Sequence, residues 1–329
     1  MPDTLIIFVV LLSLAFDYIN GFHDTANAIA TSVSTRALTP RVAVWMAAGL
    51  NFLGAMYSTG VAKTIGSDLV TSAQVVNEQI IIAAMIGAVI WNLLTWWMGI
   101  PSSSSHALVG GVVGAVLVAR GYEALKVEGI LKIVAALVCS PLIAMVTGLI
   151  IMSVLFWIFG KMSPHRINPK FKRLQVLTAA MMAFSHGSND AQKAMGIITL
   201  TLVSTGYLTS LEVPLWVKMV AATAMGLGTA AGGWRIIRTM GTKIFKLEPI
   251  SGFAADLNSS IVIFGATLMH LPVSTTHVVS GSIMGVGTAK RISAVRWGVA
   301  QQMLMAWVLT IPSTAMVSAF IYKVMSLFF

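Results

Sequence analysis

Long apolar stretches alternate with short polar segments along the whole chain. They run about 4–34, 42–62, 77–99, 103–119, 129–160, 174–202, 214–234, 250–270, 274–289 and 297–328. Most of them approach the roughly 20 residues that an α-helix needs to cross a bilayer, and the strand-like alternation of a membrane barrel is absent. The pattern therefore predicts an all-α polytopic membrane protein with about 10–12 transmembrane helices, including broken or re-entrant helices.

An internal repeat divides the chain into two halves. The residues that recur in the same order are Asp24 and Asp190, Pro101 and Pro272, His106 and His277, and Pro141 and Pro312. Members of each pair lie 166 to 171 residues apart, which indicates a duplication. We expect a first repeat over 1–160, a basic cytoplasmic linker over 161–173 and a second repeat over 174–329. Five apolar segments in each half is an odd number, so the two repeats should have opposite orientations in the membrane.

The charges of the loops test this orientation. The linker is rich in basic residues, namely Lys161, Arg166, Lys170, Lys172 and Arg173, and the positive-inside rule places it in the cytoplasm. Loop 203–213 has no Lys or Arg, whereas loop 235–248 has four. This alternation predicts that both termini lie outside and that the repeats are inverted, as in many transporters. The net charge of +10 then reflects cytoplasmic loops rather than a nucleic-acid partner.

Two hydroxyl-rich motifs each stand before an apolar stretch. They are Pro-Ser-Ser-Ser-Ser-His over 101–106 and Pro-Val-Ser-Thr-Thr-His over 272–277. Proline and Ser or Thr are favoured where a helix begins. A helix that begins inside the protein presents free N–H groups and hydroxyls at its positive end, which is a site for an oxyanion. The alternative is that these hydroxyls only bond the backbone one turn back, but two related copies favour the binding site.

Asp and Asn side chains occur at corresponding places near the start of each half. Gly21–Ala28 contains Asp24 and Asn27, and His186–Ala194 contains Asn189 and Asp190. Two buried carboxylates cannot both stay ionised without positive partners. Carboxylate and amide oxygens suit hard cations such as sodium. An ion pair with Lys193 is an alternative in the second half only, and protonation of the aspartates, which would mean proton coupling, is another.

Four histidines accompany these motifs, namely His23, His106, His186 and His277. They lack the regular ligand spacing of a transition-metal site, so we expect structural or hydrogen-bonding roles for them. The repeated glycines of the two apolar stretches, such as Gly110 and Gly281, are typical of close helix packing.

These motifs together resemble the duplicated signature of the inorganic phosphate transporter (PiT) family, and the resemblance covers essentially the whole chain. The usual Gly-Ala-Asn-Asp core is here Gly-Phe-His-Asp, which leaves the role of His23 open. The resemblance implies a plasma (inner) membrane secondary transporter, a sodium/phosphate symporter working by alternating access, and a homodimer. It also implies sodium as the coupling ion, and no cofactor is expected. The alternative is a proton-coupled phosphate, metal-phosphate or sulfate permease.

The resulting hypothesis is one composite site in the middle of the bilayer. Phosphate would be bound by Ser104, Ser105, Thr275, Thr276, Asn27 and Gln192. Sodium would be bound by Asp24, Asn27, Asn189, Asp190, Ser103 and Ser274, without a transition metal. Two other classes of function fit less well. An intramembrane enzyme would need a nucleophile and base beside the paired aspartates, and a passive anion channel would need no buried carboxylates.

Overall fold

The fold is built almost entirely from helices. A computed structural model describes residues 2–328, with side chains from Thr4 to Phe328. The long helices are α1 (Pro2–Ser34), α2 (Pro40–Tyr57), α4 (Glu78–Met98), α5 (Ser104–Arg120), α6 (Val127–Phe159), α7 (Pro164–Asp190), α8 (Gln192–Ser204), α9 (Leu215–Ala231), α11 (Pro249–Leu268), α12 (Thr275–Lys290) and α13 (Trp297–Met325). Shorter ones are α3 (Gly60–Asp68), α10 (Trp234–Arg238) and a π-helical turn (Thr239–Lys243). Within 2–328 there is no β-strand.

Local sequence explains several of the helix ends. Pro40, Pro164 and Pro249 each stand in the first turn of a helix, where proline costs no hydrogen bond. Gly99 ends α4 with a φ of +68°, a left-handed conformation that favours glycine. α2, α4 and α11 begin close to where the apolar pattern predicts them, whereas α7 begins at Pro164, inside the predicted linker.

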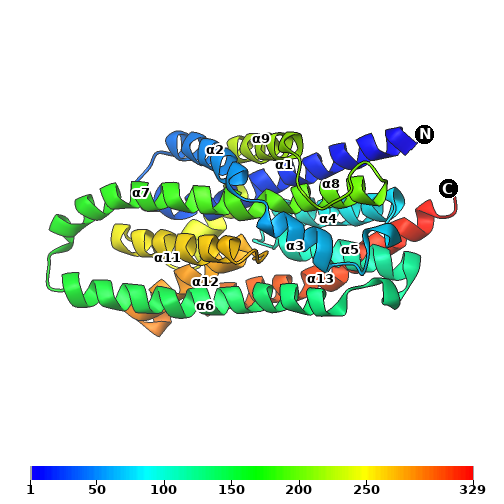
Figure 1. Ribbon diagram of the computed structural model, residues 1–329. Helices are drawn as coiled ribbons and strands as arrows, with labels where there is room; N and C mark the ends of the chain where they lie inside the picture. Colours follow the sequence, from blue (N-terminus) through cyan, green and yellow to red (C-terminus); the bar gives the residue numbers. More distant parts are fainter. Residues whose placement is uncertain (1, 329) are drawn as a thin grey trace.

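The two halves of the chain run in opposite directions through the molecule. The first turn of α1 and the last turn of α13 lie at one end, and the short connection between α6 and α7 lies at the other (Figure 1). α1 and α7 therefore run antiparallel, and so do α6 and α13 (Figure 1). This is the arrangement that inverted repeats produce.

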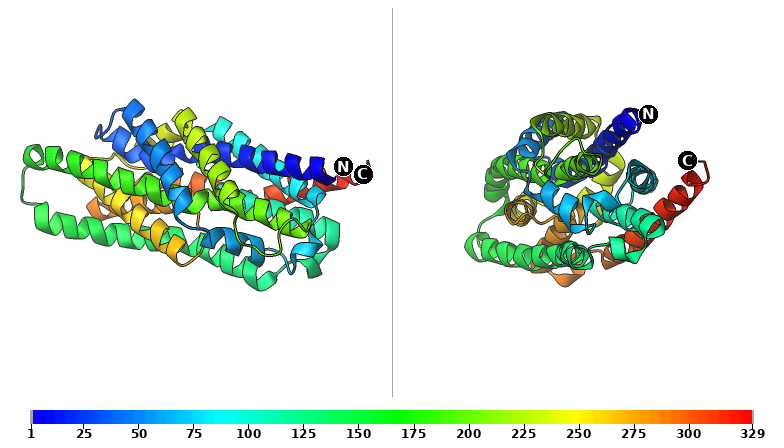
Figure 2. Two further views of the ribbon diagram at one scale, coloured as in Figure 1. Left: turned by 45° about the horizontal axis from the view of Figure 1, so that its top comes forward. Right: turned by 45° about the vertical axis from the view of Figure 1, so that its right-hand side comes forward.

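The halves are also intertwined. α1 packs on α9 of the other half, and α7 correspondingly packs on α2; α5 packs on α13, and α12 packs on α6 (Figure 2). The repeated glycines make the last two contacts close. A Cβ on Gly281 would lie 2.4 Å from the carbonyl oxygen of Pro141, and one on Gly110 would lie 2.5 Å from that of Ile311. The expectation of close packing at these glycines is confirmed.

All ten predicted apolar segments are helical, with differences in detail. The segment 42–62 bends by 66° between α2 and α3, and 174–202 is interrupted at Ala191. α1 is one continuous helix from Pro2 to Ser34. Residues 164–173 of the predicted linker belong to α7. By length and composition five of the described helices can cross a bilayer, and the bent pair α2 and α3 makes a sixth.

Candidate functional site

The two hydroxyl motifs begin helices in the interior of the protein. The backbone N–H of His106 donates to Ser103 Oγ at 3.2 Å, and that of His277 donates to Ser274 Oγ at 3.3 Å. Ser103 and Ser274 are therefore the N-caps of α5 and α12, and both are buried. The first turn of each helix presents its positive end to the space between α1 and α7.

Asp24 of α1 is bonded by both of these helix starts. Its Oδ2 accepts a hydrogen bond from Ser104 of α5 at 3.2 Å, and its Oδ1 accepts one from Thr276 of α12 at 3.2 Å. His23 Nδ1 lies 2.8 Å from the same Oδ1. The other ring nitrogen of His23 lies 3.2 Å from Thr95 Oγ1 of α4. The first-half aspartate is thus surrounded by hydroxyls and an imidazole.

Asp190 of α7 has a different set of partners. Thr275 donates to its Oδ2 at 3.1 Å, and Lys193 Nζ lies 2.9 Å from its Oδ1. Lys193 is fully buried. His186 Nε2, one turn before Asp190, lies 3.6 Å from Oδ2. The two neighbouring threonines of α12 therefore connect the two aspartates, and Asn27 Nδ2 donates to both of those threonines, at 3.2 and 3.0 Å.

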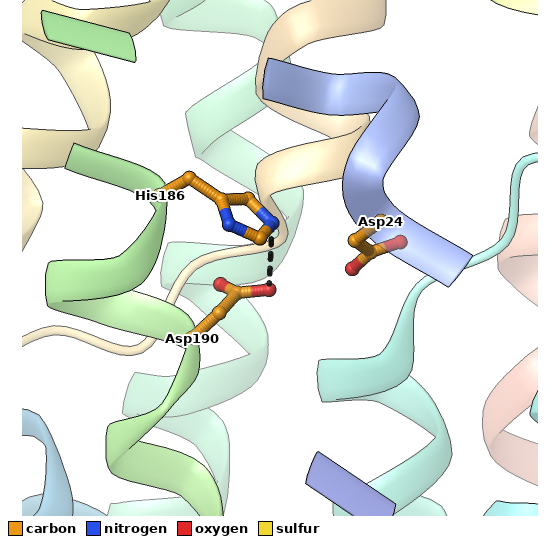
Figure 3. Close-up of side chains that lie close together, drawn as sticks. All are labelled: Asp24, His186 and Asp190. Atoms are coloured by element: carbon orange, nitrogen blue, oxygen red, sulfur yellow. Dashed lines mark ion pairs between the residues drawn. The ribbon is translucent and has the colours of Figure 1, made fainter. Parts of the chain in front are cut away.

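The two aspartates and His186 converge on one point. Ligand atoms of Asp24, His186 and Asp190 all lie within 4.8 Å of one another, and Figure 3 shows Asp24 of α1 beside the pair from α7. His186 Nδ1 lies 3.1 Å from Asn51 Oδ1, an atom that can only accept, so this nitrogen carries the proton. In the neutral ring Nε2 then presents a lone pair toward the carboxylates. This arrangement can bind a small cation.

Several of the predicted site residues form hydrogen bonds to other protein groups instead of facing the site. Asn189 donates to Thr267 Oγ1 and to the carbonyl of Leu271, and it accepts from the N–H of Val273. Ser105 donates to the carbonyl of Val273 at 2.9 Å. Both side chains thereby hold the extended segment that precedes α12.

Gln192 also bonds the backbone. Its Nε2 donates to the carbonyl of Ser188 and its Oε1 accepts from the N–H of Ala62 in α3 at 3.1 Å. Asp24, Asn27, Asp190, Ser104, Thr275 and Thr276 are the predicted residues that the structure brings together.

Two of the histidines form a separate aromatic cluster with Trp307. The rings of His106 and His277 lie 4.5 Å apart between centroids, and His277 stacks on Trp307 of α13 at 3.8 Å. These contacts fit the expected structural roles. His186 is the residue whose part in the cluster sequence reasoning missed. Its spacing of four residues before Asp190 was the available signal, because residues i and i+4 are neighbours on a helix.

The described conformation closes the site on all sides. Asp24, Asn27, Ser104, Asp190, Thr275 and Thr276 are all buried, with at most 2% of their surface exposed. Buried carboxylates beside two helix starts at the centre of an apolar helical protein are expensive, and they are typical of ion and substrate pathways in membranes.

Comparisons with known proteins identify the family. Residues 20–318 match the phosphate transporter family. The chain belongs to this family. It is 52% identical to a "probable low-affinity inorganic phosphate transporter" of Bacillus subtilis over 327 residues, which cover 99% of this chain and 98% of the relative. It is also 46% identical to a protein of the same description from Rhizobium meliloti, and this match covers 97% of this chain and 96% of the relative.

A solved structure has the same fold. The protein described as "the sodium-dependent phosphate transporter" matches with a TM-score of 0.89 and 27% identity, covering 99% of this chain and 100% of that chain. These members of the phosphate transporter family are transporters, not enzymes, so this chain is a multi-pass membrane transporter of the family.

Proposed function

We propose that this member of the phosphate transporter family is a sodium-coupled symporter of inorganic phosphate that works by alternating access. The observation that supports it best is the bridge formed by the helix starts: hydroxyls of α5 and α12 donate to the two buried aspartates. Phosphate would take these hydroxyl donors away from the aspartates, and a cation would replace the donors at the carboxylates. The need for both ligands at once provides the coupling.

The coupling follows from the number of donors. Phosphate at the positive ends of α5 and α12 would accept hydrogen bonds from Ser104, Thr275 and Thr276 and from first-turn N–H groups. These hydroxyls now donate to Asp24 and Asp190, and each has a single proton to donate. The carboxylates would lose their partners beside a newly arrived anion, which is costly unless a cation replaces them. Phosphate and cation therefore bind together.

The proposed sodium lies between the two aspartates. Its ligands would be Asp24, Asp190 Oδ2 and His186 Nε2, together with Asn27 Oδ1, which is buried and has no hydrogen-bond partner among the described residues. Lys193 already neutralises the other oxygen of Asp190. In this proposal Ser103, Ser274, Asn189, Ser105 and Gln192, whose side chains bond the backbone, position the site rather than contact the ions.

Alternating access would have to move helices of both halves together. Displacement of one sequence half against the other would separate α5 from α13 and α12 from α6, contacts in which glycines bring the backbones close. We therefore propose that each moving unit combines helices of both repeats. The plasma-membrane location, with both termini outside, and the homodimer remain predictions from loop charge and from the family resemblance.

Proton coupling is the second candidate, and one contact favours it. His23 Nδ1 lies 2.8 Å from Asp24 Oδ1 with both side chains buried, so a proton could take the place of sodium on this pair.

Transport by purified protein in liposomes distinguishes sodium coupling from proton coupling. Uptake of radiolabelled phosphate should rise under an inward sodium gradient, and a proton gradient alone should not drive it. Sulfate should compete weakly. Uptake driven only by the proton gradient would replace sodium with a proton in this account, and uptake without any cation gradient would indicate a channel.

A further inference from the structure

A polar stripe continues along α1 beyond the central site. Ser13, Asp17 and Asn20 precede Asp24 at intervals of four, three and four residues, which places them on one face of the helix. All three are fully buried. Seven residues of helix, or about 10 Å, separate Asp17 from Asp24, in the direction of the first turn of α1. The site described above uses none of these three side chains.

These side chains have no partners. Ser13 Oγ, both carboxylate oxygens of Asp17 and both amide atoms of Asn20 are buried without a hydrogen bond in the described part of the chain. A buried polar atom that nothing satisfies is destabilising, so these atoms call for a partner. Asp256 of α11 is also a buried carboxylate off the central site, but it differs because it accepts hydrogen bonds from Thr31 and Gln175.

A fourth side chain without partners faces the same stripe from α4. Both amide atoms of Asn92 are buried and unbonded within residues 4–328. Thr95, one turn later, lies 3.2 Å from His23 of α1, so the face of α4 that carries Asn92 and Thr95 is turned to α1. His23 contacts Thr95, and apolar residues that precede them in both helices pack in the same core cluster. α1 and α4 therefore run in the same direction. Asn92 therefore stands at the level of Asn20.

We propose that Ser13, Asp17, Asn20 and Asn92 form a second sodium site, separate from the proposed central one. One carboxylate, two amide oxygens and a hydroxyl are the oxygen donors that hard cations take, and water bonded to the amide N–H groups would complete the shell. Protonation of Asp17 alone would leave the two amides unsatisfied. Lys193 does not fill this place, because its Nζ is bound to Asp190.

The position of the site suggests its use. Ser13, Asp17 and Asn20 precede Asp24 along α1, so the site lies between the central aspartates and the end of the molecule where α1 begins. A sodium ion held at Asp17 would be two helical turns from Asp24, on the side that loop charge predicts to be outside. The site would thus collect the coupling ion before it reaches the centre.

Thermal unfolding of the purified full chain in detergent, without phosphate, tests the proposal. The sodium-dependent rise in Tm is measured in NaCl against choline chloride at equal concentration, so that general salt effects cancel. Asp24→Asn is used as the background because it removes a ligand of the proposed central cation. We expect Asp24→Asn to keep a sodium-dependent rise and Asp17→Asn/Asp24→Asn to lose it.

Asp256→Asn/Asp24→Asn is the matched control, since it removes a buried carboxylate that has partners, and it should keep the rise. Asn92→Ala/Asp24→Asn should need at least tenfold more sodium, and it serves if the Asp17 variant does not fold. No sodium response in Asp24→Asn, or the same response with and without Asp17, would overturn the proposal. Failure of the central cation site would look different: Asp24→Asn would then respond to sodium like the wild type.

Discussion

The first-half and second-half aspartates occupy corresponding positions but differ in how their charge is balanced. Asp24 is bonded by two hydroxyls and His23, whereas Asp190 has one hydroxyl and the buried ammonium of Lys193. The position of the first half that corresponds to Lys193 is Asn27, which donates instead to Thr275 and Thr276. The repeat thus supplies one carboxylate with a cation from the chain and leaves the other without one.

This difference bears on how many free ions the transporter uses. A symmetric pair of Asp and Asn clusters would bind two equivalent sodium ions. With Lys193 fixed to Asp190, one of these places is taken by a side chain that cannot leave. We therefore expect fewer sodium ions per phosphate in this chain than in a variant in which the second half is made like the first.

The largest expected effect is that of Asp190→Asn, because it leaves Lys193 as a buried unpaired charge. Removing one partner of a buried ion pair costs about 3–5 kcal/mol, so we expect a large loss of stability in denaturant or thermal unfolding, together with loss of sodium-stimulated uptake. Asp24→Asn should abolish uptake with a much smaller loss of stability. Asp190→Asn/Lys193→Gln should recover stability but not uptake. Equal stability of Asp24→Asn and Asp190→Asn would remove the proposed difference between the halves.

The two threonines of α12 sharpen the comparison at the level of single hydrogen bonds. Thr276→Ala removes a donor to Asp24, and Thr275→Ala removes one to Asp190. A hydrogen bond to a charged group contributes about 1.5–3 kcal/mol, so each change should raise the KM for phosphate at least about tenfold. Asp24 has no lysine, so the KM for sodium should change more in Thr276→Ala. Kinetics of phosphate uptake at varied sodium measure both constants, and the opposite order would contradict the account.

The smallest effect concerns the packing that positions the helix starts. Gly281→Ala would place a Cβ 2.4 Å from the carbonyl oxygen of Pro141, and overpacking of this kind costs about 1–3 kcal/mol. We expect a moderate drop in Tm with KM values less affected than in Thr276→Ala. Gly265→Ala is the control, because a Cβ there would meet no heavy atom within 4 Å apart from its own helix backbone. Equal Tm values for the two variants would show that the close contact of Gly281 with Pro141 does not contribute to stability.

Much of the fold is readable from the sequence because proline, glycine and loop charge punctuate it. The apolar stretches and the prolines at 40 and 249 mark where helices begin. The start of α7 at Pro164 was not predicted, because the basic residues that follow it indicated a linker. The sequence does not determine which long helix breaks: α1 continues through Gly21, while the second-half counterpart is interrupted at Ala191. Nor does it show that α5 packs on α13 and α12 on α6, because any apolar helix face can pack against several others.

The site could be predicted in part for a similar reason. Asp24, Asp190 and the hydroxyls after Pro101 and Pro272 were identifiable because charges and helix starts are costly at membrane depth. The direction in which a polar side chain points on a fully buried helix cannot be identified from the sequence. Asn189 and Gln192 belong to the same motif as Asp190, yet both bond the backbone of neighbouring segments, and His186 points to Asp190 from one turn away.

The stoichiometry of coupling tests the central claim most directly. Phosphate and sodium fluxes into proteoliposomes, followed with two radiolabels under a defined gradient, give the number of sodium ions per phosphate. Lys193→Asn makes the second half match the first, so it should bind an additional sodium at Asp190 and increase the ratio by one relative to the wild type. An unchanged ratio in an active Lys193→Asn variant would contradict the proposal that this lysine takes the place of a coupling ion.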